Sequence, residues 1–166
     1  MINMIQNAKD QAAALAMSAY RAAVADGTLP EAEVKTAPVE IPKDTANGDF
    51  TTTFALAASK ALRQSPRNIA QTLLDLMDLE GTYFASAEIA GPGFLNFRLN
   101  PSWYEGGMQA VESEGEPYGT NDGLKGKKYM VEFVSANPTG PLHMGNARGG
   151  VLGDTLAAVL AHCGAM

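Results

Sequence analysis

Apolar residues in the first half of the chain recur at the spacing of amphipathic helices. One helix is predicted over residues 2–25, because the pattern stops at Asp26-Gly27. A second helix is expected after the turn Asn47-Gly48-Asp49, with Asp49 as its cap. A third should begin at Ser65-Pro66, where proline needs no amide donor, and end before Gly81. The predicted buried faces are Ile2, Ile5, Ala12, Leu15, Ala19 and Ala22 in the first helix, Phe50, Phe54, Ala57, Ala61 and Leu62 in the second, and Ile69, Leu73, Leu76 and Met77 in the third.

Strand-like segments alternate with these helices. Residues 39–42 are a short strand candidate, and residues 82–90 and 94–99 form a predicted hairpin around Gly91-Pro92-Gly93. A short helix should follow from Pro101 to about Ser113. Together these elements predict an α+β N-terminal domain over residues 1–116, with helices packed on a small, mostly antiparallel sheet.

The remaining sequence has the order strand, loop, helix. Residues 117–128 have the glycine-rich, charged composition of an inter-domain linker. The apolar run 129–134 predicts a strand buried on both faces of a parallel sheet, and a helix is expected from Gly145 to Gly164. This order predicts the first unit of a Rossmann-like α/β domain over residues 129–166. One strand cannot form a sheet, so the chain is expected to be truncated before that domain is complete.

Charge and composition narrow the classes of function. A net charge of -6 argues against a broad basic surface for nucleic acid, and any RNA contact must be local. The clusters Lys60/Arg63/Arg67 and Lys125/Lys127/Lys128 are most simply solvated surface charge. The single cysteine, Cys163, cannot form an intramolecular disulfide, and no signal or membrane-spanning segment is predicted, which favours the cytoplasm.

The loop from Ser135 to Asn146 is the strongest candidate for chemistry. In an open α/β sheet, nucleotides bind at the carboxyl end of a strand such as 129–134. His143 lies close to a predicted helix N-terminus, where free N–H groups attract phosphate, although a lone histidine there is more often structural. Asn146 alone is readily explained as a helix cap. Glu132 is equally well explained as a charge at an exposed strand end or as a carboxylate in an apolar strand that meets a cation. The chain contains neither GxxxxGK[ST] nor GxGxxG.

Several segments resemble one enzyme family. The run from Val131 to Ala157, centred on Asn137-Pro138-Thr139-Gly140-Pro141-Leu142-His143-Met144-Gly145-Asn146, resembles the HxGH signature of class I aminoacyl-tRNA synthetases in its arginyl-tRNA synthetase form. Gly48-Asp49-Phe50, Pro66-Arg67-Asn68-Ile69-Ala70 and the segment 90–97 resemble the additional N-terminal domain of the same family. The resemblance implies ATP-dependent activation of arginine and its attachment to tRNA, with this chain as the N-terminal portion and inactive alone.

The resemblance also assigns roles to residues and names partners. His143 and Asn146 would be catalytic; Pro138, His143, Gly145 and Asn146 would bind ATP; and Glu132, Ser135 and Asn137 would bind arginine. The whole signature loop comprises Ala136, Asn137, Pro138, Thr139, Gly140, Pro141, Leu142, His143, Met144, Gly145 and Asn146. Expected partners are tRNA(Arg), L-arginine and ATP with Mg²⁺; no protein-bound metal, DNA or membrane is expected, and the full-length enzyme should be a cytoplasmic monomer.

Two positions depart from the pattern of the family. Asn146 replaces the last histidine and cannot carry a charge. Gly140 occupies a position where some arginyl enzymes have a lysine, so a lysine-bearing KMSK loop is expected beyond Met166. The alternative function is a non-catalytic RNA-binding or scaffolding module that retains the additional domain. A reading frame that continues into a nucleotide-binding fold would distinguish the enzyme from this module.

Overall fold

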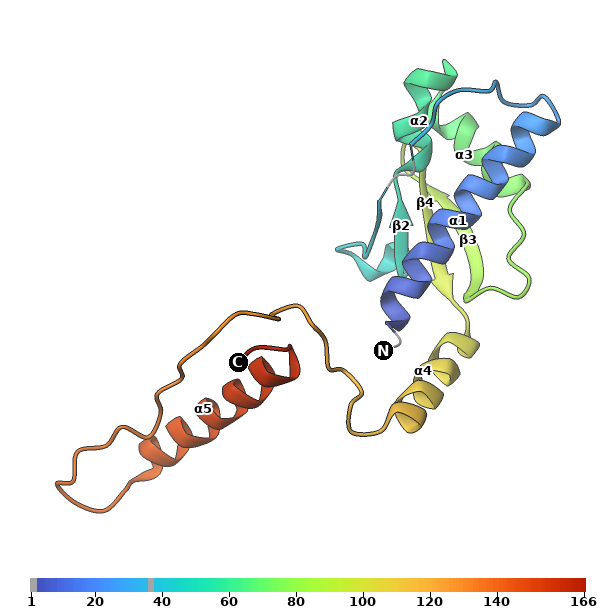
Figure 1. Cartoon of the computed structure of the whole chain (residues 1–166). Helices are drawn as coiled ribbons and strands as arrows, with labels where there is room; N and C mark the ends of the chain where they lie inside the picture. Colours follow the sequence, from blue (N-terminus) through green and yellow to red (C-terminus); the bar gives the residue numbers. More distant parts are fainter. Residues whose placement is uncertain (1–2, 36–37) are drawn as a thin grey trace. The chain divides into compact units, whose positions relative to one another are not determined.

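The computed structural model describes residues 3–35 and 38–166 and contains two compact units (Figure 1). The N-terminal unit spans Ile2–Gln109, and the C-terminal unit spans Ala110–Met166. In chain order the elements are α1 Met4–Ala25, β1 Val39–Glu40, η1 Thr45–Asn47, β2 Phe50–Thr52, α2 Phe54–Leu62, α3 Pro66–Asp75, β3 Phe84–Ala90, β4 Phe94–Leu99, α4 Pro101–Glu114 and α5 Met144–His162.

The N-terminal unit is an α+β domain with a four-stranded antiparallel sheet, as predicted. Its strand order is β1-β2-β4-β3, so β2 pairs with β4 across a long connection. The predicted hairpin is the β3–β4 pair, with its turn at residues 91–93. The register places Glu40, Thr51, Asn96 and Glu88 side by side across the four strands, on one face of the sheet.

Helices α1, α2 and α3 pack against the opposite face, which forms the core. Phe50, Leu95 and Phe97 point into this core, and the Phe97 ring centroid lies 5.0 Å from that of Phe84. Small side chains let α1 approach closely, because its buried stripe is mostly alanine. That stripe consists of Met4, Ala8, Ala12, Ala16, Ala19, Tyr20 and Ala23.

Tyr20 fixes the segment that follows α1. Its hydroxyl accepts a hydrogen bond from the Ala32 amide and donates to the Ala32 carbonyl, both at 3.0 Å. The Tyr20 ring packs against Phe54, with centroids 6.1 Å apart. One side chain therefore satisfies two backbone groups of a connection that has no secondary structure of its own.

Several predictions for this unit are corrected by the structure. On α2, Ala57 and Ala61 are exposed, contrary to the predicted buried face, and Ala55 and Ala58 are buried instead. Phe50 belongs to β2 and not to the second helix, and Asp49 accepts a hydrogen bond from the Leu99 amide at 2.8 Å, tying β2 to β4. On α1, Ile5 is 47% exposed and Ala22 is also exposed, so the buried face is rotated from the predicted one. In an alanine-rich helix several faces are about equally apolar, and the sheet selects among them. Ile2 lies outside the described residues.

The start of α3 is confirmed as predicted. Ser65 is its N-cap and accepts a hydrogen bond from the Asn68 amide at 3.3 Å, with Pro66 at the first helical position. The helix ends at Asp75, so the exposed Leu76 is not part of its buried face.

The C-terminal unit contains α5 and a long irregular segment. The prediction of a buried strand at 129–134 is wrong for this structure, because the segment is extended without ladder partners and Met130 is 97% exposed. A strand needs neighbouring strands for its amides and carbonyls, and no described residues offer them here. Residues 121–129 instead exchange backbone hydrogen bonds with the last residue of α5 and the chain after it, including Tyr129 N to Met166 O at 2.9 Å.

The extended segment packs against glycines of α5. A Cβ added to Gly153 would lie 2.2 Å from Phe133 Cγ, and one on Gly150 would lie 3.0 Å from a Val134 methyl. Val134 has a positive φ of 56°, an unfavourable geometry for a β-branched residue. Elsewhere on α5, the apolar side chains of Leu152, Leu156 and Val159 are exposed. Among the described residues, no helix combines the length and apolarity that a membrane span requires.

Candidate functional site

The predicted chemistry lies at the N-terminus of α5, where His143 and Asn146 form a reciprocal cap. His143 Nδ1 accepts a hydrogen bond from the Gly145 amide at 3.1 Å, and Asn146 Oδ1 accepts from the His143 amide at 3.1 Å. His143 is thus the N-cap, and Asn146 is the third helical residue. The motif residues satisfy the first amides of the helix.

Gly145 allows the imidazole to lie this close to the backbone. A Cβ at position 145 would be 3.0 Å from His143 Cε1 and 3.1 Å from Nδ1, closer than side chains normally pack. Because Nδ1 accepts a hydrogen bond, the proton of a neutral imidazole lies on Nε2. Asn146 likewise uses its oxygen in the cap and keeps its amide N–H groups. The pair therefore retains hydrogen-bond donors, which suit an anion.

A cavity of about 470 Å³ adjoins this cap. His143 and Asn146 line it together with apolar groups from Val134 to Gly150. Glu132, Ser135, Asn137 and Pro138 do not line it.

The other predicted site residues are spread along the exposed loop. Ser135, Asn137 and Pro138 belong to irregular chain, as does Glu132, and their side chains are exposed. Thr139 donates its amide to the Asn137 carbonyl at 2.8 Å, a tight local turn. The structure brings two predicted residues together, and the grouping of the arginine-binding set stays a prediction. The remaining loop positions are Ala136, Gly140, Pro141, Leu142 and Met144, of which Ala136 is half-buried and the others are exposed.

A second candidate site, which was not predicted, lies on the face of the sheet away from α1–α3. We call it the outer groove: a hollow of about 590 Å³ between the chain after β1 and the β3–β4 hairpin. It is lined by Glu40, Ile41, Pro42, Lys43, Asn47, Thr51, Ala90, Gly91, Pro92, Phe94 and Asn96. The lining combines apolar groups and one aromatic ring with five polar side chains, a mixture found in small-molecule sites.

One buried polar group of the outer groove lacks a partner among the described residues. Asn96, which lines the groove, is only 2% exposed. Thr51 Oγ1 is buried and is unpartnered within residues 3–35 and 38–166. Buried polar groups are normally hydrogen-bonded, so the unsatisfied Thr51 hydroxyl calls for a partner such as a water molecule or a ligand.

The hairpin turn at the rim of the groove is fixed by α3. Gly93 has φ of 138°, and a Cβ there would lie 2.8 Å from the Pro66 carbonyl group. Arg67 Nη1 donates to the Gly91 carbonyl at 3.1 Å. On the other side of the groove, Arg98 donates to the Ala46 carbonyl at 2.7 Å, which holds the η1 connection near the sheet.

Sequence reasoning missed the outer groove because Thr51 and Asn96 meet only through the β2–β4 register. The available signal was alternation: within β2 and β4, polar Thr51 and Asn96 stand between core residues.

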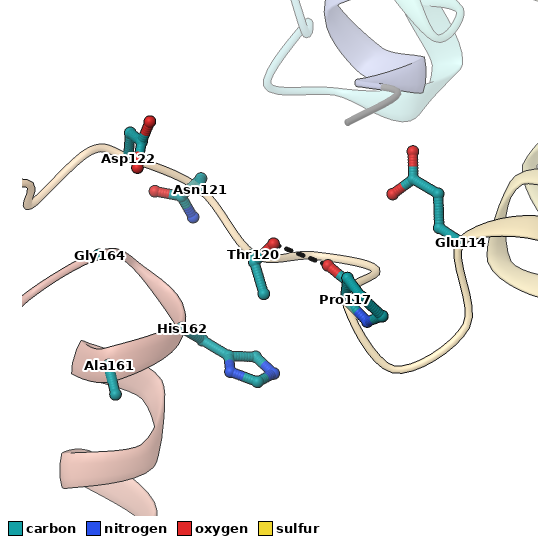
Figure 2. Close-up of a pocket in the computed structure, with 8 residues that line it drawn as sticks. All are labelled: Glu114, Pro117, Thr120, Asn121, Asp122, Ala161, His162 and Gly164. Atoms are coloured by element: carbon teal, nitrogen blue, oxygen red, sulfur yellow. Dashed lines mark hydrogen bonds between the residues drawn. The ribbon is translucent and has the colours of Figure 1, made fainter.

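A third cavity, of about 600 Å³, lies beside the end of α5 (Figure 2). His162 extends into it from the last turn of α5, and Thr120 donates to the Pro117 carbonyl at 2.8 Å along its wall. Asn121 and Asp122, which also line this cavity, are exposed to solvent. No group of three or more His, Cys, Asp or Glu side chains suited to a metal ion occurs in the part of the chain that the structure describes.

The family follows from the sequence of the N-terminal unit. Residues 6–99 match the family described as arginyl tRNA synthetase N terminal domain, which is more than half of the 166 residues. The α+β unit is therefore of the class of N-terminal domains described for tRNA synthetases. The chain belongs to the arginyl-tRNA synthetase N-terminal domain family.

Curated relatives with similar sequences are considerably longer. An arginine–tRNA ligase from Acetivibrio thermocellus is 46% identical over 164 residues, 99% of this chain and 29% of that protein. One from Caldanaerobacter subterraneus subsp. tengcongensis is 41% identical over 164 residues, again 99% of this chain and 29% of that protein. The chain thus spans under a third of the length of these curated relatives. The solved Thermus thermophilus arginyl-tRNA synthetase aligns with 90% of this chain and 23% of its own at 28% identity, with a TM-score of 0.39.

Proposed function

We propose that this chain is the N-terminal portion of an arginine–tRNA ligase, which activates L-arginine with ATP and attaches it to tRNA(Arg). Residues 1–116 would form the tRNA-contacting domain, residues 117–128 a linker, and residues 129–166 the beginning of a Rossmann-like catalytic domain. The full-length protein would be a cytoplasmic monomer. The observation that carries the proposal is the family match over residues 6–99, and the outer groove supports contact with RNA.

The outer groove has the chemistry to hold one unstacked base of an RNA loop. Phe94 offers an aromatic ring for stacking, and Asn96 and Asn47 offer amides that can pair with the edge of a base. The Thr51 hydroxyl adds a donor and an acceptor. Because the chain carries a net charge of -6, a local pocket of this kind fits better than a broad electrostatic surface.

The C-terminal unit would supply the first part of the activation site. In adenylate formation, an arginine carboxylate oxygen attacks the α-phosphorus of ATP, and the bond to pyrophosphate breaks. His143 Nε2 and the Asn146 amide would donate to phosphate oxygens, which stabilises the charge of the transition state. Mg²⁺ would arrive bound to the ATP phosphates. Glu132, Ser135 and Asn137 would bind arginine once the segment 129–134 joins a complete sheet.

Two measurements test the proposal at different levels. The 166-residue chain should bind a tRNA(Arg) transcript more tightly than a non-cognate tRNA, and it should not support arginine-dependent ATP–pyrophosphate exchange. The full-length protein from the same gene should support that exchange, and His143→Ala should lower its rate by about one to three powers of ten.

The outcomes separate the enzyme from a scaffolding or RNA-binding module. A full-length protein that binds tRNA(Arg) but never activates arginine would support the module. A chain without affinity for any tRNA at low salt would refute the RNA-contacting role of the N-terminal unit.

A further inference from the structure

Two sequence segments that resemble family motifs meet in space at the rim of the outer groove. Residues 66–70 begin α3, and residues 90–97 form the hairpin turn and β4. Gly93 lies against Pro66 so closely that no side chain would fit, and Arg67 bonds to Gly91. Gly91 and Pro92 themselves line the groove. One hydrogen bond therefore places Arg67 beside the groove.

Most donors of Arg67 remain available there. Its guanidinium carries five N–H groups, and the bond to Gly91 O uses one nitrogen. Arg67 is exposed and forms no ion pair with any residue that the structure describes. Arg98, by contrast, lies 3.4 Å from the Glu88 carboxylate, which offsets its charge. A guanidinium that is fixed but unpaired suits a phosphate, because little side-chain entropy is lost on binding.

The charges around the groove favour this side of it for a phosphate. Glu40 lines the opposite side, on the edge strand β1, and would repel an anion. Lys43 also lines that side, but no hydrogen bond or ion pair fixes its ammonium among the described residues. If a nucleotide places its base in the groove, its phosphate should therefore lie toward the hairpin turn.

We propose that Arg67 binds the phosphodiester of the nucleotide whose base occupies the outer groove. The inference rests on the proposed function, because it requires the groove to take a base of tRNA(Arg). It assigns a role to an arginine that composition alone leaves as solvated surface charge, and it explains why the turn is locked to the start of α3.

The test is a salt series of tRNA(Arg) binding by the 166-residue chain and its variants, measured by fluorescence anisotropy. Arg67→Gln should weaken binding about tenfold near 0.1 M salt, since it removes a charged hydrogen bond. It should also reduce the slope of log affinity against log salt by about 0.7 to 0.9, the loss of one phosphate contact. Arg67→Lys should restore the slope but only part of the affinity, because lysine keeps the charge without the planar fork.

Two variants serve as controls. Arg21→Gln removes an exposed arginine from α1, which covers the other face of the sheet, and should change neither affinity nor slope. Asn96→Ala removes a groove amide and should weaken binding at every salt concentration with an unchanged slope. Thermal unfolding of each variant should show an intact fold.

Each outcome has one meaning. If the wild-type chain does not bind, or if Asn96→Ala binds as well as wild type, the proposed use of the groove is refuted. If Asn96→Ala weakens binding while Arg67→Gln keeps the wild-type slope, the phosphate contact of Arg67 is refuted and the proposed function stands. Equal effects of Arg67→Gln and Arg21→Gln would also overturn the inference.

Discussion

Two neighbouring threonines of β2 should respond in opposite ways to the same substitution. Thr51 Oγ1 is buried in the outer groove without a partner among the described residues. Thr52 points to the core, and its hydroxyl donates to the Pro38 carbonyl at 3.2 Å. Valine has nearly the shape of threonine, so Thr→Val changes mainly the hydroxyl. The pair therefore measures the energetic consequence of leaving Thr51 unsatisfied.

The magnitudes follow from the hydrogen bonds. A buried polar group without a partner costs about 1–3 kcal/mol, so Thr51→Val should stabilise the chain by about 1 kcal/mol. Thr52→Val removes a made hydrogen bond and should destabilise it by a similar ~1 kcal/mol. For a domain of this size, these changes correspond to shifts of roughly 4–8 °C in Tm, upward for Thr51→Val and downward for Thr52→Val.

The assay combines urea unfolding followed by circular dichroism with tRNA(Arg) binding. Thr51→Val should raise the unfolding midpoint and weaken tRNA binding about 2- to 10-fold, because the Thr51 hydroxyl is proposed to form a hydrogen bond with the bound base. Thr52→Val should lower the midpoint without a specific effect on binding by the folded chain. If Thr51→Val destabilises the chain as much as Thr52→Val, then the hydroxyl is already satisfied and the reasoning about the groove is wrong.

Three further predictions follow from single contacts. Tyr20→Phe should cost about 1–2 kcal/mol in urea unfolding because two backbone groups of Ala32 lose their partner; the exposed Tyr104→Phe is the control, and equal effects would contradict the account. Gly145→Ala should displace the His143 ring and speed hydrogen exchange at the amide of residue 145. Gly149→Ala is the control and should not, because a Cβ there meets open space. Unchanged exchange in Gly145→Ala would show that a Cβ at position 145 does not crowd the His143 ring. Hydrogen bonds from the Thr28 hydroxyl and amide lower the pKa of the Asp26 carboxyl below 3.8. The stability that Asp26 contributes should therefore be present above the pKa of the unfolded chain and be lost as pH falls through the lowered pKa, so Asp26→Ala should destabilise the chain at pH 6 and not at pH 2. An effect of Asp26→Ala that does not depend on pH would count against this account.

The sequence predicted local structure correctly where residues within one turn determine it. Ser65-Pro66 gave the correct start of α3 because capping depends on residues within one turn. Helical spacing predicts Phe50 in the second helix, because it lies four residues before Phe54. The three consecutive threonines after Phe50 favour a strand, since β-branched residues are restricted in helices, and the structure follows that preference over residues 50–52.

Long-range placement was not predictable from the sequence. The outer groove depends on β2 pairing with β4 across two helices, and no local pattern specifies that register. The segment 129–134 has the composition of a buried strand, yet a strand forms only where other strands accept its hydrogen bonds. Its apolar residues pack instead on the glycines of α5, as Phe133 does on Gly153.

The cap at α5 relates the structural and the functional interpretations of the signature loop. A histidine and an asparagine that cap a helix need no ligand to explain them, and each uses an acceptor atom for that purpose. The cap therefore fixes which atoms remain: Nε2 of His143 and the amide of Asn146, both donors at the positive end of a helix of 19 residues. The same two bonds that hold the loop in place thus leave two hydrogen-bond donors, as the proposed binding of phosphate requires. Replacing the usual motif histidine with Asn146 keeps this arrangement, because an amide can both accept in the cap and donate outward, whereas a neutral imidazole that accepts retains a single donor.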